Sequence, residues 1–381
     1  MPTDTNTDPI DGPLLLKTLI DATVVDELSA RVAAVWPPFD RPGFEAAANA
    51  DLAARALKAR SAHIADCLRQ RLPEPFEQAI AIVLESLPVP DDRGGIEGVD
   101  GFRYMPLLDV VGRHGTDDPE PALDALETLT LHFSAEFAIR PFLARFPDRT
   151  WPRIDRWAGG ADWRLRRLAS EGTRPRLPWG ERLAASIADP GPGIAVLDRL
   201  HADPHPVVRR SVANHLNDVA KDHPDRAVDV ATRWWEQSDG AGRGTVRHAL
   251  RGLVKAGNTR ALELMGFHGG DAVAVKRLTV RPDTVRLGEA VTIEVQLHST
   301  APSPINLVID YRLDRPIAGG RRSSKVFKLA TRRLEPGCSA SLERRIVIRQ
   351  LSTRTYHPGS HEVHLMVNGL DLGSASFELV G

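Results

Sequence analysis

Apolar residues recur at helical spacing along the first two thirds of the chain. From residue 12 to residue 267 they form stripes in segments that Gly, Pro and Asp separate. A stripe that repeats every three to four residues indicates an amphipathic helix with one face toward a core. Clear cases run through residues 122–133 and 207–219. The pattern therefore predicts an all-helical region over residues 12–267, preceded by a flexible N-terminus at residues 1–11.

Prolines support the helical interpretation. Pro119, Pro141, Pro152, Pro204 and Pro224 stand where new helices would begin. Proline costs least in the first turn of a helix, because its missing N–H would have no intrahelical partner there. We therefore expect each of these prolines near a helix start.

A weak internal repeat runs through the helical region. Basic doublets follow an apolar residue at 165–167, 208–210 and 246–248, with a period near 40 residues. That period is typical of HEAT-type helical pairs, which stack into a solenoid because one pair cannot bury its apolar face alone. The repeated basic residues would line one concave face, or they would point from the outer face into solvent. The spacing leaves both alternatives open.

The hydrophobic pattern changes period near residue 270. Apolar and polar residues alternate in segments such as 276–280 and 290–297, and alternation is the period of a half-buried β-strand. Turn signals such as Asn368-Gly369 divide about seven short strands. We therefore predict an all-β immunoglobulin-like sandwich of the disulfide-free kind over residues 271–381, after a hinge at 267–270.

Composition places the chain among soluble globular proteins. Its 381 residues, 42% of them hydrophobic, suffice for two or three domains with ordinary cores. The N-terminus is polar and acidic, and no apolar run approaches the ~20 residues that cross a bilayer. We expect a cytoplasmic protein with no membrane partner. Cys67 and Cys338 lie too far apart to suggest a disulfide framework or a metal site, and we interpret both as structural thiols.

Charge is distributed unevenly behind a net charge of −1. Acidic residues dominate the first hundred residues, the middle of the chain is nearly balanced, and residues 271–381 are basic. Nearly all cations of residues 101–270 are arginine, which is the better planar donor for phosphate oxygens. The distribution is a modest argument for nucleic acid as a partner.

One short stretch, residues 162–179, concentrates several kinds of chemistry. It holds five arginines, two tryptophans and carboxylates around a helix that Gly172 and two prolines bring to an end. Arginines suit phosphates, and an indole suits the face of a flat base. The combination suggests an enzyme that acts on nucleic acid.

Four segments in order carry a family resemblance. They are FRYMP at 102–106, SAEFAIRPF at 134–142, the stretch around Glu171, and NHLNDVAKDHP at 214–224. Together they closely resemble the AlkC-type DNA alkylation repair glycosylases, over most of residues 12–267. Some members of that family carry a C-terminal immunoglobulin-like domain, which residues 271–381 resemble.

The resemblance implies a fold and an activity. The fold is a HEAT-like solenoid followed by an immunoglobulin-like domain. The activity is excision of cationic methylated bases from double-stranded DNA in base excision repair, without flipping the base out of the duplex. The chief substrate would be N3-methyladenine, with N3-methylcytosine as a further candidate. The resemblance implies no metal and no cofactor, and we expect a monomer in the bacterial cytoplasm.

The resemblance also implies site residues. Glu136 and Glu171 match the two active-site carboxylates of the family, and Asp218 matches a third acidic position. Arg167 and Trp179 match residues that contact DNA near the lesion.

Further arginines are candidates for contacts with the DNA backbone. An acidic cleft would repel the phosphates of the substrate unless cations lie nearby. Besides Arg167, we expect Arg174, Arg210 and Arg247 in that role, since phosphate contacts position a duplex without reading its sequence.

The chemistry explains why carboxylates would be needed. An N3-methylated purine already carries a positive charge, so its departure leaves an oxocarbenium-like sugar without prior protonation of the base. Negative charge beside the developing cation stabilises it, and a carboxylate also orients or deprotonates the incoming water. One well-placed group of this kind contributes on the order of 2.7–4 kcal/mol.

Structural alternatives stand beside these assignments. Glu136 could be a solvent-facing helical residue paired with Arg140 four residues later. Asp218 could cap the next helix or pair with Lys221, and Trp179 could belong to a core. The histidines show no tight ligand spacing, so we expect no metal site.

Two further functions remain open for the whole chain. A HEAT scaffold could bind DNA or protein without catalysis, or the chain could be a protein-interaction adaptor. In the enzyme interpretation the basic sandwich would bind the same DNA from the minor-groove side through three arginine pairs. These pairs are Arg321-Arg322, Arg332-Arg333 and Arg344-Arg345.

Overall fold

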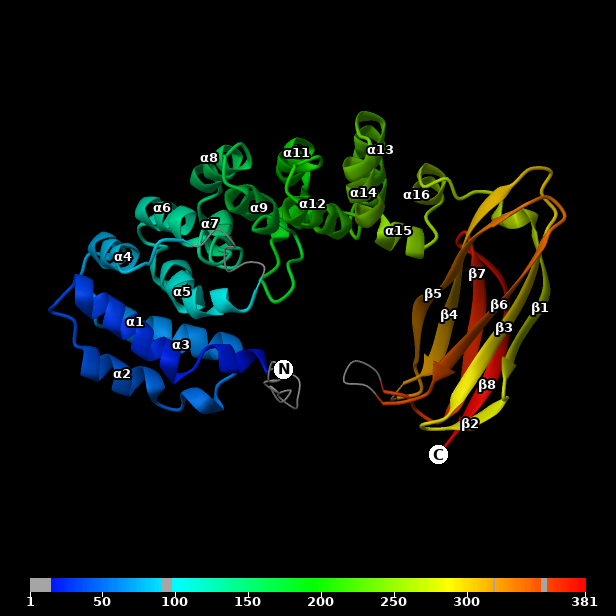
Figure 1. The fold of residues 1–381 in the computed structure, drawn as a ribbon, viewed down its shortest axis with the longest axis horizontal. Helices are drawn as coiled ribbons and strands as arrows, with labels where there is room; N and C mark the ends of the chain where they lie inside the picture. Colours follow the sequence, from blue (N-terminus) through cyan, green and yellow to red (C-terminus); the bar gives the residue numbers. More distant parts are fainter. Residues whose placement is uncertain (1–14, 91–97, 318, 351–354) are drawn as a thin grey trace, which may run out of the picture. The chain divides into compact units, whose positions relative to one another are not determined.

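The fold is known from a computed structural model that describes residues 15–90, 98–317, 319–350 and 355–381. The flexible N-terminus predicted for residues 1–11 lies outside these ranges. The chain divides into two compact units, Met1–Asp218 and Val219–Gly381. The first unit is helical, and the second combines helices with β-strands (Figure 1).

The first unit is built from short helices joined by tight connections. They are η1 (Leu16–Leu19), α1 (Ala22–Val35), α2 (Arg41–Asn49), η2 (Leu52–Ala54), α3 (Leu57–Arg69), α4 (Phe76–Glu85), η3 (Asp100–Tyr104), α5 (Met105–His114), α6 (Pro119–Leu129), α7 (Arg140–Arg145), α8 (Pro147–Ala158), α9 (Trp163–Glu171), α10 (Ala184–Ala188), α11 (Gly191–Leu200) and α12 (Pro206–Val219). Neighbours pack in pairs, with α1 against α2, α3 against α5, α4 against α6 and α8 against α9. The predicted helical region is confirmed.

The prolines lie near helix starts with one exception. Pro119 and Pro224 begin α6 and α13, Pro141 is the second residue of α7, and Pro204 lies two residues before α12. Pro152 instead lies inside α8, so the predicted start at that position is wrong. Helix α8 continues past Pro152 because another face of the helix, with Ile154 and Trp157, is buried.

The second unit begins with four helices and continues into strands. The helices are α13 (Pro224–Gln237), α14 (Gly240–Ala249), α15 (Arg251–Lys255) and α16 (Thr259–Leu264), followed by the turn η4 (Gly270–Ala272). The strands are β1 (Val273–Arg281), β2 (Thr284–Arg286), β3 (Ala290–Ser299), β4 (Ile305–Pro316), β5 (Arg322–Leu334), β6 (Ser339–Val347), β7 (Gly359–Val367) and β8 (Leu370–Val380). The predicted change from helix to strand near residue 270 is confirmed.

The strands form a sandwich of two sheets. In the described residues one sheet has the order β1-β3-β6 and the other the order β2-β8-β7-β4-β5. The pairing is antiparallel except between β2 and β8. Strand β2 was not predicted as a separate strand, because its three residues are too few to show alternation.

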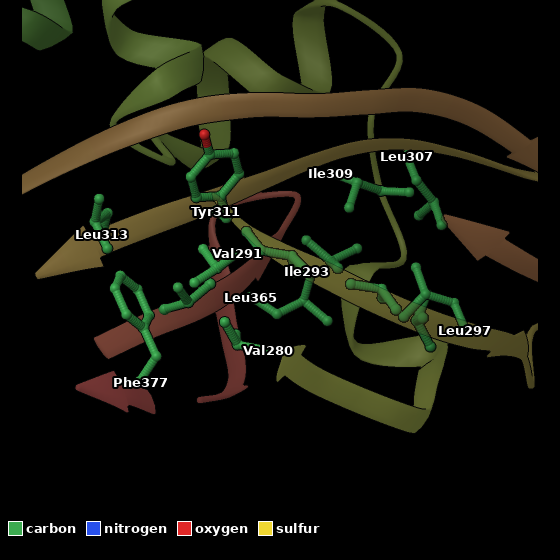
Figure 2. Packing of buried hydrophobic residues seen from close by; sticks show 14 of the residues in the cluster. Val280, Val291, Ile293, Leu297, Leu307, Ile309, Tyr311, Leu313, Leu365 and Phe377 are labelled. Carbon is green, nitrogen blue, oxygen red and sulfur yellow. The ribbon is translucent and has the colours of Figure 1, made fainter. Parts of the chain in front are cut away.

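Alternating residues of both sheets fill the space between them. Figure 2 shows Val291 and Ile293 of the smaller sheet meeting Ile309, Leu365 and Phe377 of the larger sheet. All five are at most 2% exposed. This is the apolar core that the alternating pattern predicts.

The cysteines are both free, Cys67 buried and Cys338 exposed. Within the described ranges, no helix has the length and apolar character that crossing a membrane requires.

Candidate active site

A cleft of about 330 Å³ opens in the first unit where α9 and the chain after it face the segment between α6 and α7. Its lining combines an apolar, largely aromatic wall with two arginines and two glutamates. The lining residues are Gly98, Phe102, Met105, Phe133, Ser134, Glu136, Phe137, Arg167, Glu171, Arg174, Leu177, Pro178 and Trp179. The cleft thus brings together five of the eight site residues that the sequence predicts in the helical region.

Glu136 lies in the turn between α6 and α7 and not in a helix. Its Oε2 accepts hydrogen bonds from Ser134 Oγ and from Arg167 Nη2, both at 2.8 Å. Arg167 Nη1 also donates to Ser134 Oγ at 2.6 Å, which closes a ring of three side chains. The alternative of a helical pair with Arg140 is therefore wrong. The Glu136 carboxylate is held by Arg167 and keeps 15% of its side chain exposed.

Glu171 is the last residue of α9, and it lies deeper in the cleft. Its Oε1 accepts a hydrogen bond of 2.5 Å from Arg174 Nη1. Arg174 also donates from Nε and Nη2 to Oδ2 of Asp218 in α12, at 2.8 Å each. The three groups are at most 6% exposed. One guanidinium therefore bridges two buried carboxylates that lie far apart in the chain.

A hydroxyl completes the surroundings of Glu171. Ser211 Oγ of α12 lies 2.6 Å from Oε2 of Glu171 and 2.9 Å from Ser170 Oγ. Burial raises the pKa of Glu171, but the charges of Arg167 and Arg174 and the hydrogen bond from Ser211 outweigh it and hold the pKa below its ordinary value. The carboxylate is therefore ionised in a nearly dry environment.

One face of α12 supports this arrangement. Ser211, His215 and Asp218 follow the helical period, so all three side chains point toward α9. His215 Nδ1 lies 2.9 Å from the carbonyl oxygen of Ser170, and it donates there because a carbonyl only accepts. Burial lowers the pKa of His215 to about 4, so the imidazole is neutral. Sequence reasoning missed Ser211 and His215, although their spacing from Asp218 was a usable signal.

Trp179 is 60% exposed at the edge of the cleft. A core role for this tryptophan is therefore wrong. Its φ of 64° lies in the left-handed region, which is uncommon for a residue with a side chain. The backbone must be held there by its surroundings.

The remaining predicted arginines lie elsewhere. Arg210 is exposed on α12. Arg247 belongs to α14 of the second unit, stands 4.9 Å from the ring centroid of Trp235 and lines a different cavity. Of the repeated basic doublets, Arg167 reaches the cleft, whereas Arg166 pairs with the buried Asp203 at 2.6 Å. The phosphate contacts expected of Arg174, Arg210 and Arg247 stay predictions.

The cleft can stabilise a positive charge without carrying a net charge itself. Two carboxylates, Glu136 and Glu171, face it, and each is held by an arginine. Four aromatic side chains share the lining, Phe102, Phe133, Phe137 and Trp179, and an apolar lining strengthens electrostatic interactions beside it. Such a site suits a reaction whose transition state develops positive charge.

Comparison with known sequences relates the chain to a bacterial family. The model of the family described as "Uncharacterised protein YhaZ, C-terminal Ig-like domain" matches residues 274–381. Over 365 residues the chain is 30% identical to the Bacillus subtilis (strain 168) protein called "Uncharacterized protein YhaZ", covering 96% of this chain and 99% of that protein. The predicted immunoglobulin-like fold of the C-terminal region is confirmed by this family model.

Comparison with solved structures extends the likeness to both regions of the chain. The Pseudomonas fluorescens alkylpurine DNA glycosylase AlkC, solved bound to DNA containing an abasic site analog, is 39% identical in sequence. The match covers 96% of this chain and 99% of that one, with a TM-score of 0.88. The folds of the helical region and of the β-sandwich are therefore both shared with that glycosylase.

Proposed function

Because the chain belongs to the AlkC family of alkylpurine DNA glycosylases, we propose that it excises alkylated bases from double-stranded DNA by hydrolysing the N-glycosidic bond. The substrates are bases that alkylation makes cationic, chiefly N3-methyladenine, with N3-methylcytosine as a further candidate. The enzyme would act as a monomer in the bacterial cytoplasm, as part of base excision repair, and without a metal or cofactor.

The observation that carries this proposal is that Glu171 is buried and yet ionised. It is 6% exposed, and two arginines and a serine hydroxyl keep its pKa low. Even a paired buried carboxylate is often less favourable than an apolar residue of similar volume, and this one lies at a cleft. Such an arrangement is costly for a purely structural residue and useful for a group that must be negative when a cation forms beside it.

The proposed reaction has two parts. The bond between C1′ and the base nitrogen breaks, and its electron pair neutralises the cationic base, which leaves without a proton from the enzyme. The sugar becomes an oxocarbenium ion, which the charges of Glu136 and Glu171 stabilise. A water molecule then bonds to C1′ and gives its proton to one of these carboxylates, which leaves an abasic sugar.

The neighbours of the two glutamates have supporting roles. Arg174 holds Glu171 in place and, with Arg167, keeps it ionised, Asp218 holds Arg174, and Arg167 holds Glu136. Trp179, exposed at the edge of the cleft, contacts the sugar or base at the lesion. This indole is part of the lining of the 330 Å³ cleft.

The sandwich domain would hold the same DNA. Its three arginine pairs are exposed, and they lie on or beside β5 and β6, which are edge strands of the two sheets. Adjacent residues of a strand point to opposite faces, so each pair spreads charge over both sides of its strand. Exposed arginines of this kind bind phosphates without reading the sequence.

The test is release of free bases from methylated duplex DNA, with the bases identified by mass. We expect release of N3-methyladenine by the wild-type protein. Removal of one electrostatic group costs on the order of 10²–10³ in rate, so Glu171→Gln and Glu136→Gln should each lower the rate by that order.

A scaffold without catalysis is the competing outcome. It would bind DNA with an affinity that falls with salt and would release no base. If release occurs and survives both glutamine substitutions, the assignment of the carboxylates is wrong. The pH profiles of the two variants identify the carboxylate that accepts the proton, because its loss removes the acid limb.

A further inference from the structure

The loop that carries Trp179 runs from the end of α9 at Gly172 to Leu183, just before α10. It presents an exposed indole on a backbone with φ of 64°. A non-glycine residue in this conformation costs roughly 1–2 kcal/mol, so the loop needs specific contacts to stay in place. The backbone of the loop also makes hydrogen bonds of its own, among them Gly180 N–H to Leu177 O and Leu183 N–H to Pro175 O, both at 3.1 Å.

One buried side chain joins the two ends of this loop. Arg140, the first residue of α7, donates from Nη1 to the carbonyl of Gly172 at 2.9 Å and from Nε to the carbonyl of Glu181 at 2.7 Å. Gly180 packs directly on it, since a Cβ at that position would lie 3.3 Å from Nε. A guanidinium is a rigid fork, so these two bonds fix the separation of the loop ends.

The contacts of Arg140 are costly if stability is their only purpose. The side chain is 2% exposed, and both of these partners are carbonyls. In the described part of the chain Nη2 is buried without a hydrogen-bond partner. Burial, and next the charge of Arg174, lower the pKa of Arg140 to about 10. An apolar residue of similar volume would fill the space at lower cost.

A second contact holds the tryptophan itself. Lys58 of α3 donates from Nζ to the carbonyl oxygen of Trp179 at 2.9 Å. The same ammonium lies 5.4 Å from the ring centroid of Phe137, which lines the cleft. Two cations from different helices therefore hold the loop at its start, at its tip and at its end.

We infer that Arg140 and Lys58 are positioning residues that set Trp179 over the cleft. Neither lines the cleft, and both act on the loop through its carbonyl oxygens. The expected effect of Arg140 and Lys58 on catalysis rests on the proposed function. Their expected effect on the loop does not depend on any activity.

The first test is a double-mutant cycle on base release. Arg140→Met should lower kcat/KM by about tenfold to a hundredfold, because small misplacements of contact groups cost that much. In a Trp179→Ala background, Arg140→Met should lower kcat/KM almost no further, since the indole that Arg140 positions is absent. Full additivity of the two effects would overturn the inference. Arg140→Lys should not restore the rate, because an ammonium cannot bridge both carbonyls.

The matched control is Arg60. It is 5% exposed and donates to four backbone carbonyls away from this loop. Arg60→Met should destabilise the fold to a similar degree yet leave kcat/KM unchanged for the folded protein. Equal reductions of kcat/KM in Arg60→Met and Arg140→Met would show that Arg140 acts only on stability.

The second test needs no DNA and no activity. Arg140→Met and Lys58→Met should each speed amide hydrogen exchange in residues 172–183, about tenfold or more, while Arg60→Met leaves these residues unchanged. Lys58 is exposed, so its variant folds even where Arg140→Met does not. Unchanged exchange in both loop variants would overturn the inference. A wild-type protein that releases no base would instead refute the proposed function and leave this test valid.

Discussion

Glu171 and Asp218 share one guanidinium. Arg174 lies 2.5 Å from the former and 2.8 Å from the latter, and all three groups are buried. Two carboxylates in a dry environment repel one another, and the positive charge of the arginine between them offsets this repulsion. Asp218 does not line the cleft. It influences the cleft by holding Arg174, which does line it.

Removal of this arginine should damage both stability and activity. Arg174→Met leaves two buried carboxylates without their cation, which should lower the unfolding free energy by about 3–5 kcal/mol. The pKa of Glu171 should rise, so the acid limb of the pH profile for base release should move to higher pH. Chemical denaturation and pH–rate profiles measure the two effects.

Arg166→Met is the control for that variant. Arg166 lies on α9, the helix that ends at Glu171, and pairs with the buried Asp203 outside the cleft. Its substitution should destabilise the protein without moving the pH profile. A profile that moves equally in both variants would contradict the role of Arg174.

Ser211→Ala should have a smaller effect of the same kind. The hydroxyl donates to a charged group at 2.6 Å, a bond of about 1.5–3 kcal/mol. Its removal should raise the pKa of Glu171 and lower base release most at acidic pH. Ser61→Ala, which removes a hydroxyl bound to the Asp109 carboxylate, should cost stability without changing the pH profile.

Stability should fall as the pH drops below the ordinary pKa of histidine. The pKa of His215 is lowered from 6.5 to about 4 in the folded protein, so between these values the unfolded chain binds a proton that the folded protein does not. Unfolding free energy therefore rises with pH across this window and decreases as the pH falls, by about 3 kcal/mol at most. Below the ordinary pKa of glutamate, 4.5, the unfolded chain also takes up a proton at Glu171 that the folded protein does not, and this continues the decrease.

His215→Asn isolates this contribution. The amide keeps a donor for the carbonyl of Ser170 but does not titrate. Denaturation at pH 7 and pH 5 should show a smaller difference for the variant than for the wild type. An equal difference would mean that other groups cause the pH dependence.

Trp179 can be removed with little cost to the fold. The side chain is 60% exposed, so Trp179→Ala should change unfolding free energy by about 0.5 kcal/mol or less. Trp179→Gly should be at least as stable as Trp179→Ala, because glycine adopts the positive φ of this position without strain. Both should lower base release. A normal rate in either would exclude a contact of the indole with the lesion.

The arginine pairs of the sandwich should control the salt dependence of DNA binding. Substitution of Arg332, Arg333, Arg344 and Arg345 by Gln should weaken binding. The slope of log affinity against log salt should become shallower by about 0.9 for each phosphate that the variant leaves unbound. Arg260→Gln is the control, because that arginine pairs with Asp225 and Asp229 of its own unit. An unchanged slope in the fourfold variant would show that these arginines of the sandwich do not bind the phosphates of the DNA.

Sequence periodicity was sufficient for the elements and for part of the site. The helical stripes, the change near residue 270 and the alternating strands follow from the 3.6 and 2.0 periods, which are local properties. The resemblance to a family singled out Glu136, Arg167, Glu171 and Trp179, and these residues share one cleft. Residues whose role depends on backbone carbonyls, such as Arg140, were not predicted. Every residue has such a carbonyl, so the sequence does not show which of them will accept a side-chain hydrogen bond.

The amino-acid sequence by itself therefore determined which faces are apolar, where helices give way to strands, and which carboxylates are candidates for the chemistry of a glycosylase. Only the tertiary structure decided that Arg174 lies between Glu171 and Asp218, that Glu136 pairs with Arg167 and not with Arg140, and that Trp179 is exposed. The physical reason is that pairing and burial depend on distances between helices, and these are set by packing of the whole unit.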